Sequence, residues 1–184
     1  MTLSLALRRL GLLAAAALVG TALGMGPLYA AGTDTPPAPS TPPKPIDCTK
    51  TTCNTIDQLQ QQAYEKFLRA YRAARLIILA GNYRGGIAAM HALGQDDHPD
   101  VANYIGYAYR HLGNYEKSKL WYEAALKSDP NHARTWSYYG MWQMEQGNRL
   151  KALDDLQKVK LICGTADCKE YLQLKAVIDG RASY

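Results

Sequence analysis

The dipeptide Gly-Asn recurs at nearly constant spacing, and this recurrence constrains the fold more than any other feature of the chain. It occurs at Gly81-Asn82, Gly113-Asn114 and Gly147-Asn148, which are 32 and 34 residues apart. Self-similarity at this period is typical of stacked helical hairpins. Glycine and asparagine tolerate the left-handed backbone conformation that commonly ends a helix. We therefore expect each dipeptide to form the turn between two antiparallel helices.

The middle copy, residues 99–132, shows the pattern most clearly. Its first half places small and apolar residues at helical spacing before the Gly-Asn turn: Ala102, Ile105, Gly106, Tyr109 and Leu112. Its second half repeats the pattern with Tyr115, Ser118, Tyr122, Ala125 and Leu126. Asp129-Pro130 then ends the second helix, because a residue before proline is disfavoured in the helical conformation.

These residues resemble the tetratricopeptide repeat family. Gly106 and Ser118 match its small positions and Ala125-Leu126 its repeat ending. Its large positions are matched by Tyr109, Tyr115 and Tyr122. The copy at 133–166 has Trp136, Tyr139-Gly140, Gly147-Asn148, Ala152 and Leu156, but Gly164 replaces the final proline. The copy at 67–98 is two residues shorter and matches less well. The resemblance implies an all-α fold, a short right-handed α-α superhelix of about three hairpins; an unrelated bundle of helical hairpins is the alternative.

Residues 1–30 are predicted to be a signal peptide. Arg8 and Arg9 form a basic start, and no charged residue follows from Leu10 to Ala31. Small residues near Ala30 favour cleavage after that position. The alternative is an uncleaved membrane anchor, since the uncharged run is long enough to span a bilayer. Both interpretations predict export, to the periplasm or outside the cell, and the chain resembles a small exported bacterial member of the family.

Residues 31–54 are predicted to be a linker that ends in a local cysteine pair. Residues 31–47 contain six prolines and no aromatic side chain, so this segment has nothing to bury and favours extended conformations.

Four cysteines form two pairs with the same spacing, Cys48/Cys53 and Cys163/Cys168. An even number of cysteines in an exported chain favours disulfides. Three pairings can be drawn, and we expect two local bridges. Each local bridge requires a turn. A continuous helix separates residues five apart by about 7.5 Å of rise, whereas the Cα atoms of a disulfide lie at most about 6.8 Å apart. A four-cysteine metal site and a redox-active pair are the alternatives.

Two further helices are expected in the helical domain, residues 55–184. Residues 55–80 form a long helical pattern that Thr55 can cap. A final helix over 168–179, capped by Asp167, is expected to cover the end of the array, as terminal units of repeat proteins do. A role of this last helix in binding a partner is the alternative.

No constellation of catalytic residues is apparent in the sequence. The histidines His91, His98, His111 and His132 form no metal-binding motif, and no phosphate or dinucleotide loop is present. Asp154-Asp155 is expected to be a solvated pair, because neighbours on a helix point apart. We expect no enzyme activity, no cofactor and no metal. The net charge of +5 falls to about +3 without the leader, which is too small to predict nucleic-acid binding.

The family resemblance implies a concave face, lined by the first helix of each hairpin, that binds a peptide or partner protein. The candidate residues on that face are Tyr71, Arg75, Asp100, Asn103, Tyr107, Arg110, His111, Arg134, Ser137, Met141 and Met144. Aromatic, Met and Arg side chains are enriched at protein interfaces. The alternative for these residues is contact between neighbouring helices.

The sequence thus predicts an exported protein–protein interaction module. A structural spacer or assembly factor acting through the convex face or the final helix is the second hypothesis. An enzyme acting on cell-wall material is the third.

Overall fold

The structure is a computed structural model that describes the backbone of residues 52–183 and the side chains of residues 56–183. Seven helices account for most of this part of the chain, and no strand occurs in it. They are α1 (Thr52–Leu79), α2 (Tyr83–His91), α3 (Pro99–His111), α4 (Tyr115–Ser128), α5 (Ala133–Glu145), α6 (Arg149–Cys163) and α7 (Lys169–Ile178). The predicted all-α fold class is therefore confirmed. The predicted leader and the proline-rich linker lie outside the described residues.

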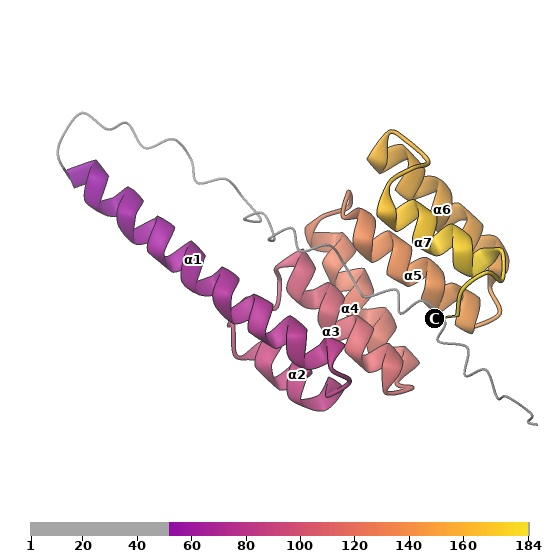
Figure 1. The fold of residues 1–184 in the computed structure, drawn as a ribbon, viewed down its shortest axis with the longest axis horizontal. Helices are drawn as coiled ribbons and strands as arrows, with labels where there is room; N and C mark the ends of the chain where they lie inside the picture. The colour runs from indigo at the N-terminus through magenta and orange to yellow at the C-terminus, as the bar shows by residue number, and fades with distance from the viewer. Residues whose placement is uncertain (1–51, 184) are drawn as a thin grey trace, which may run out of the picture.

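The helices form three antiparallel hairpins, α1/α2, α3/α4 and α5/α6, which stack side by side (Figure 1). The three Gly-Asn dipeptides form the turns within these hairpins. Gly113 has a φ of +73°, a conformation that side chains disfavour. The side chain of Asn114 then accepts a hydrogen bond from the backbone N–H of Lys117 and caps α4. Local chemistry therefore both ends one helix and starts the next.

Small residues let the two helices of a hairpin approach closely. A Cβ atom placed on Gly106 in α3 would lie 2.9 Å from the ring of Tyr122 in α4. Ser118, one turn before Tyr122, is completely buried in the same contact. This is the packing that the small positions of the repeat predict.

The C-terminal end of the array is closed by α7, which packs against α5 and α6. Leu174 is fully buried there, close to Gly140 of α5. Gly164 ends α6 with a φ of +69°, and Cys163 and Cys168 form a disulfide across the turn that follows, as predicted. The chain therefore reverses within a few residues and lays its last helix over the third hairpin.

The prediction that Cys53 belongs to the linker is wrong. Cys53 is instead the second residue of α1, which begins at Thr52. The physical reason is that no proline or glycine follows Pro45 before the helical pattern starts, so nothing stops the helix from extending toward the N-terminus. The predicted Cys48–Cys53 disulfide is not confirmed and stays a prediction, because Cys48 and the side chain of Cys53 lie outside what the structure describes.

Two predicted helix starts are also wrong. Thr55 does not precede the first helix, because α1 already begins at Thr52. Asp167 does not cap α7, whose N-cap is Cys168 without a side-chain hydrogen bond. The backbone N–H of Asp167 instead donates to the hydroxyl of Thr165, so Asp167 belongs to the turn.

Helix α1 is much longer than its partner α2, with 28 residues against 9. Its N-terminal half therefore projects beyond the body of the array (Figure 1). None of the helices in residues 52–183 combines the length and apolar character that crossing a membrane requires.

Candidate functional site

Most residues predicted to line a concave binding face are buried between helices. Asn103 and Ser137 are inaccessible to solvent, and Arg110 is 4% exposed. The other buried members of the set are Tyr71, Arg75, Asp100 and Met141. Tyr107, Arg134 and Met144 are partly buried, and His111 is exposed. A residue without accessible surface cannot contact a partner while this packing persists.

Asp100 and Arg134 form an ion pair between α3 and α5. They stand 34 residues apart, at the same position of successive repeats. The Nε2 atom of His132 lies 3.4 Å from the same carboxylate oxygen. Burial alone would raise the pKa of Asp100, but the interactions with His132 and Arg134 outweigh it and lower the pKa. The pair therefore joins the second hairpin to the third.

Arg110 makes a second connection between α3 and α5. Its Nη1 donates to the backbone carbonyl of Tyr138 at 3.1 Å, and its Nε lies 3.5 Å from Oε1 of Glu145. The guanidinium also lies over the ring of Tyr107, 5.6 Å from the centroid. Burial outweighs the positive charge of Arg110 and raises the pKa of Glu145.

Two further buried members of the set, Arg75 and Ser137, also bridge neighbouring helices. The Nε of Arg75 donates to the hydroxyl of Tyr104 at 2.7 Å, which links α1 to α3. The hydroxyl of Ser137 donates to the backbone carbonyl of Glu170 at 2.8 Å, which links α5 to α7. For these residues the structure favours the alternative interpretation, contact between neighbouring helices.

An aromatic stack is the accessible remainder of the predicted face. His111 stacks on Tyr83 with ring centroids 4.9 Å apart and lies 4.3 Å from the ring of Tyr107. His111 as a whole is exposed, but its ring loses solvent where it packs on Tyr83 and Tyr107. This desolvation and the charge of Arg110 lower the pKa of His111 to about 4, so its imidazole is neutral at physiological pH. Tyr83 did not figure in the sequence prediction, because it opens α2 rather than the first helix of a hairpin.

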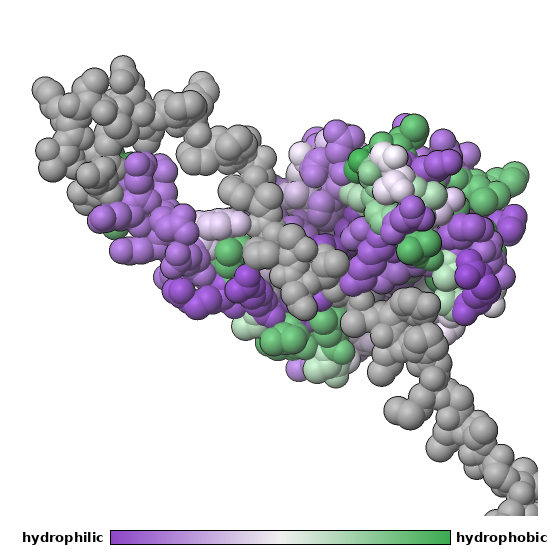
Figure 2. All heavy atoms as spheres, turned by 45° about the horizontal axis from the view of Figure 1, so that its top comes forward, coloured by the Kyte–Doolittle hydropathy of each residue, from purple (hydrophilic) through white to green (hydrophobic). Residues whose placement is uncertain are grey.

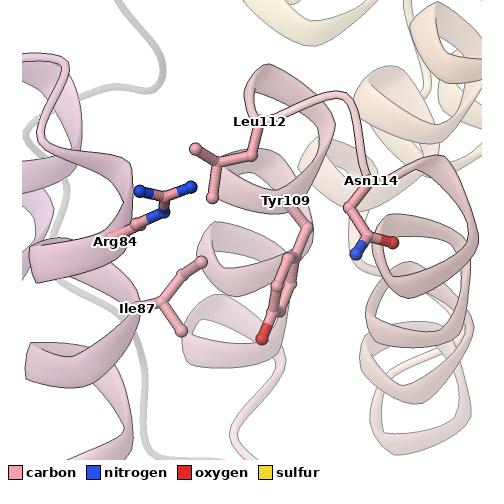
Figure 3. Close-up of a pocket in the computed structure, with 5 residues that line it drawn as sticks. All are labelled: Arg84, Ile87, Tyr109, Leu112 and Asn114. Atoms are coloured by element: carbon pink, nitrogen blue, oxygen red, sulfur yellow. The ribbon is translucent and has the colours of Figure 1, made fainter.

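A pocket of about 380 Å³ opens elsewhere, between α2, the end of α3 and the start of α4 (Figure 3). It is lined by Arg84, Ile87, Tyr109, Leu112 and Asn114. Ile87 and Tyr109 supply its apolar walls, Leu112 is 39% exposed at its rim, and Arg84 points toward Leu112 (Figure 3). Sequence analysis missed this pocket because its walls come from two different hairpins.

The pocket has a positive border. The side chain of Arg84 is exposed, and the structure gives it no ion pair within residues 56–183. Lys117 does not line the pocket, but its Nζ lies 5.2 Å from the centroid of the ring of Tyr109, which does. The site therefore combines the apolar side chains of Ile87 and Leu112 with polar groups and has two exposed cations, Arg84 in its lining and Lys117 on the ring of Tyr109.

Among the described residues, one cluster combines side-chain types that can bind a metal ion. Cys163, Cys168 and Glu170 come within 4.8 Å of one another, but both sulfur atoms belong to the disulfide and are not thiolates.

The expectation that Asp154-Asp155 is a solvated pair is wrong for Asp155, which is 7% exposed. Burial, and secondarily the charge of Asp154, raise the pKa of Asp155 to about 7.

The fold and its contacts define a class: a short stack of helical hairpins, joined by buried polar contacts between successive first helices. A family model described as tetratricopeptide repeat matches residues 99–132. The matched residues cover α3 and α4, and proteins with this repeat generally bind protein partners. A comparison with curated proteins found no match.

Proposed function

We propose that this protein is an exported, non-enzymatic interaction module of the cell envelope that binds a partner protein in the pocket between α2, α3 and α4. The tetratricopeptide repeat supports protein binding in general. The observation that carries the particular site is the open pocket, with its apolar walls and its cationic border.

This pocket is a better candidate than the predicted concave face. Arg110 and Asn103 are buried in contacts between helices, so a partner would have to displace them. Leu112 and Arg84 are exposed and need no rearrangement. The proposal keeps the interaction module of the first hypothesis from the sequence but moves its binding surface from the concave face to this pocket.

The chemistry of the pocket indicates what it would bind. Ile87 and Tyr109 provide space for a large apolar side chain, while Arg84 and Lys117 attract negative charge. The expected ligand is a partner segment in which a bulky apolar residue lies next to one or more carboxylates. Exposed charges at the border contribute mainly to the association rate and to its salt dependence.

The Cys163–Cys168 disulfide supports the proposed export, because such bridges persist in oxidising compartments. The uncharged segment after Arg9 gives the same indication. Cell fractionation, with mass spectrometry of the mature N-terminus, tests this part of the proposal. A full-length chain recovered from the cytoplasm would contradict it.

The binding site is tested with the double variant Arg84→Glu/Leu112→Asp. Partner proteins in envelope extracts are cross-linked to the wild-type protein and to this variant. We expect the amount of cross-linked partner to fall at least ten-fold with the variant. The matched control is Arg149→Glu/Leu150→Asp, which makes the same kind of change at an exposed site on α6. Equal recovery with the wild-type protein and the pocket variant, or equal loss with the control, would count against the pocket.

The final helix remains the second candidate for binding because Leu172 of α7 is 51% exposed. The variant Leu172→Asp distinguishes the two surfaces in the same assay. Loss of the partner with this variant, together with full retention by the pocket variant, would transfer the proposed function to α7.

A further inference from the structure

Helix α1 carries a second apolar face that its own fold leaves uncovered. Residues spaced alternately three and four apart lie on this face: Ile56, Leu59, Ala63, Lys66, Ala70, Ala73, Ile77 and, one residue beyond the end of the helix, Ala80. All eight are exposed, with Leu59 at 59%. Seven of the eight are apolar, and the pattern continues for about three and a half heptads, which is typical of a coiled-coil seam.

This seam is separate from the face by which α1 packs on its own array. That other face contains Tyr71, Ala74 and Ile78, all of them buried. Ala70 and Tyr71 are consecutive, so the two faces differ by roughly 100° around the helix. The N-terminal half of α1 projects beyond the array (Figure 1), and the seam residues are exposed from Ile56 to Ala80. On the face shown in Figure 2 the projecting half of α1 is mainly hydrophilic, and a hydrophobic area lies where α1 meets α2.

We infer that the seam binds α1 of a second copy of this chain, with the two helices antiparallel. Antiparallel pairing about a two-fold axis makes the seam complementary to itself. The axis would pass near residue 68, which places Leu59 against Ile77 of the other copy and Ala63 against Ala73. Ile56 would face Ala80, and the small side chains near the centre would let the two helices approach closely.

Lys66 is compatible with this arrangement. It lies near the two-fold axis, opposite Ala70 of the second copy, where a small side chain leaves room for its aliphatic stem. Its ammonium group can then reach the solvent at the edge of the seam.

Charge favours the antiparallel orientation over the parallel one. The acidic Asp57 and Glu65 outnumber Lys66 in the first half of α1, whereas Arg69, Arg72 and the buried Arg75 make the second half positive. Antiparallel pairing brings halves of opposite sign together and also opposes the two helix dipoles. Parallel pairing would instead align halves of the same sign.

The expected interface is small. Residues 56 to 80 span about 36 Å of helix, and two facing strips about 11 Å wide cover on the order of 800 Å² in total. Contacts of this size are weak and reversible. We therefore expect dimers that form reversibly and dissociate on dilution.

Sedimentation velocity of the full chain over a range of concentrations tests the inference. The wild-type protein should dimerise reversibly, and Leu59→Glu/Ile77→Glu should weaken the dimer at least ten-fold. The control Leu120→Glu/Leu150→Glu changes two exposed leucines on α4 and α6 and should leave the dimer unchanged. Circular dichroism verifies that each variant is folded.

Three results would overturn the inference. The wild-type protein could remain monomeric up to several hundred micromolar. A dimer could persist in the seam variant, which would assign association to another part of the chain, residues 1–51 included. The control could weaken the dimer as much as the seam variant does.

The orientation has a separate test in two charge designs. In Ala63→Glu/Ala73→Lys, antiparallel pairing brings opposite charges together, whereas parallel pairing brings like charges together. In Ala63→Glu/Ala73→Glu, both orientations are repulsive. We expect the first design to dimerise at least ten-fold more tightly than the second; equal weakening of the two would exclude the antiparallel seam.

Discussion

Asp155 illustrates at the residue scale how a buried carboxyl group couples folding to pH. It lies on α6, and its Cβ comes within 3.3 Å of the position that a Cβ on Gly140 would occupy. Its Oδ2 atom is buried and makes no hydrogen bond to another protein group. Burial thus penalises the ionised form, and the neighbouring Asp154 adds to the penalty.

We predict that Asp155→Asn stabilises the protein at neutral and alkaline pH. The pKa of Asp155 is raised to about 7 in the folded state from an ordinary value of 3.8. The folded protein therefore binds the proton more tightly, and stability falls as pH rises from about 4 through about 7. Removing this ionisation should increase the free energy of unfolding at pH 8 by about 2–4 kcal/mol.

Urea unfolding at pH values from 4 to 8 measures the effect of Asp155→Asn. The control is Asp97→Asn, an exposed residue in the loop before α3 that should change stability by less than about 1 kcal/mol. Parallel pH profiles for the wild-type protein and Asp155→Asn would show that this carboxyl group does not titrate as its burial implies.

Contacts between elements depend on a few buried polar groups at the scale of the helices. Arg110 connects α3 to α5 through both a backbone carbonyl and Glu145. Removing one partner of a buried pair costs more than removing both, because the other charge is left without compensation.

We therefore predict that Arg110→Met lowers the free energy of unfolding by about 3–5 kcal/mol. The double variant Arg110→Met/Glu145→Leu should recover a clear part of this loss, since it leaves no unpaired carboxylate. Chemical denaturation of the wild-type protein, both single variants and the double variant gives the coupling energy. Simple additivity of the two single effects would mean that the two side chains do not interact.

The disulfide Cys163–Cys168 acts at the junction of α6 and α7. The bridge closes a short loop, with a sequence separation of 5 residues. For a loop of this size the chain-entropy relation gives a contribution of about 2 kcal/mol. We predict that Cys163→Ser/Cys168→Ser lowers stability by about this amount and loosens α7 more than the other helices.

Hydrogen exchange followed by mass spectrometry tests the prediction for the disulfide. Amides of α7 should exchange faster in the variant, while those of α3 and α4 should keep their protection. Unchanged protection of α7 would show that Leu174 and its neighbours hold the last helix without the bridge.

The whole molecule should have opposing pH dependences in its second and third hairpins. Asp100 has a lowered pKa, so its contribution to stability is present above the ordinary carboxyl value and is lost as pH falls through the folded value. Asp155 has a raised pKa and acts in the opposite direction between about pH 4 and 7. The two groups together favour greatest stability at mildly acidic pH.

We predict that Asp100→Asn weakens the acid dependence of stability while leaving its change between pH 5 and 8 intact. The reason is that this substitution removes the titrating group but not Asp155. Thermal unfolding from pH 2.5 to 8 measures both the acid dependence and the change between pH 5 and 8. If Asp100→Asn also abolished the change in stability between pH 5 and 8, that change could not be assigned to Asp155.

The sequence by itself determined the number and position of the hairpins. The Gly-Asn turns, the small Gly106 and Ser118, and the break at Asp129-Pro130 act through backbone conformation and contacts within one repeat. Such local effects are readable without a structure.

Helix starts were less predictable than the turns between helices. The first helix includes Cys53 and begins before Thr55, and the last begins after Cys168 rather than after Asp167. Several neighbouring residues at each start can serve as a cap, and the sequence pattern does not distinguish among them.

Only the tertiary structure decided which polar side chains are buried and which surfaces stay open. Helical spacing placed Asn103 and Arg110 outside the core stripe of their own hairpin, and the next hairpin then covered them. The pocket at Arg84 and Leu112 joins residues of two hairpins. Helix α1 has two apolar faces, and only the structure shows that the array covers one of them and leaves the seam without a partner. The physical reason is common to all three: burial depends on neighbours that lie about one repeat away in the chain, and the pattern within one helix does not record them.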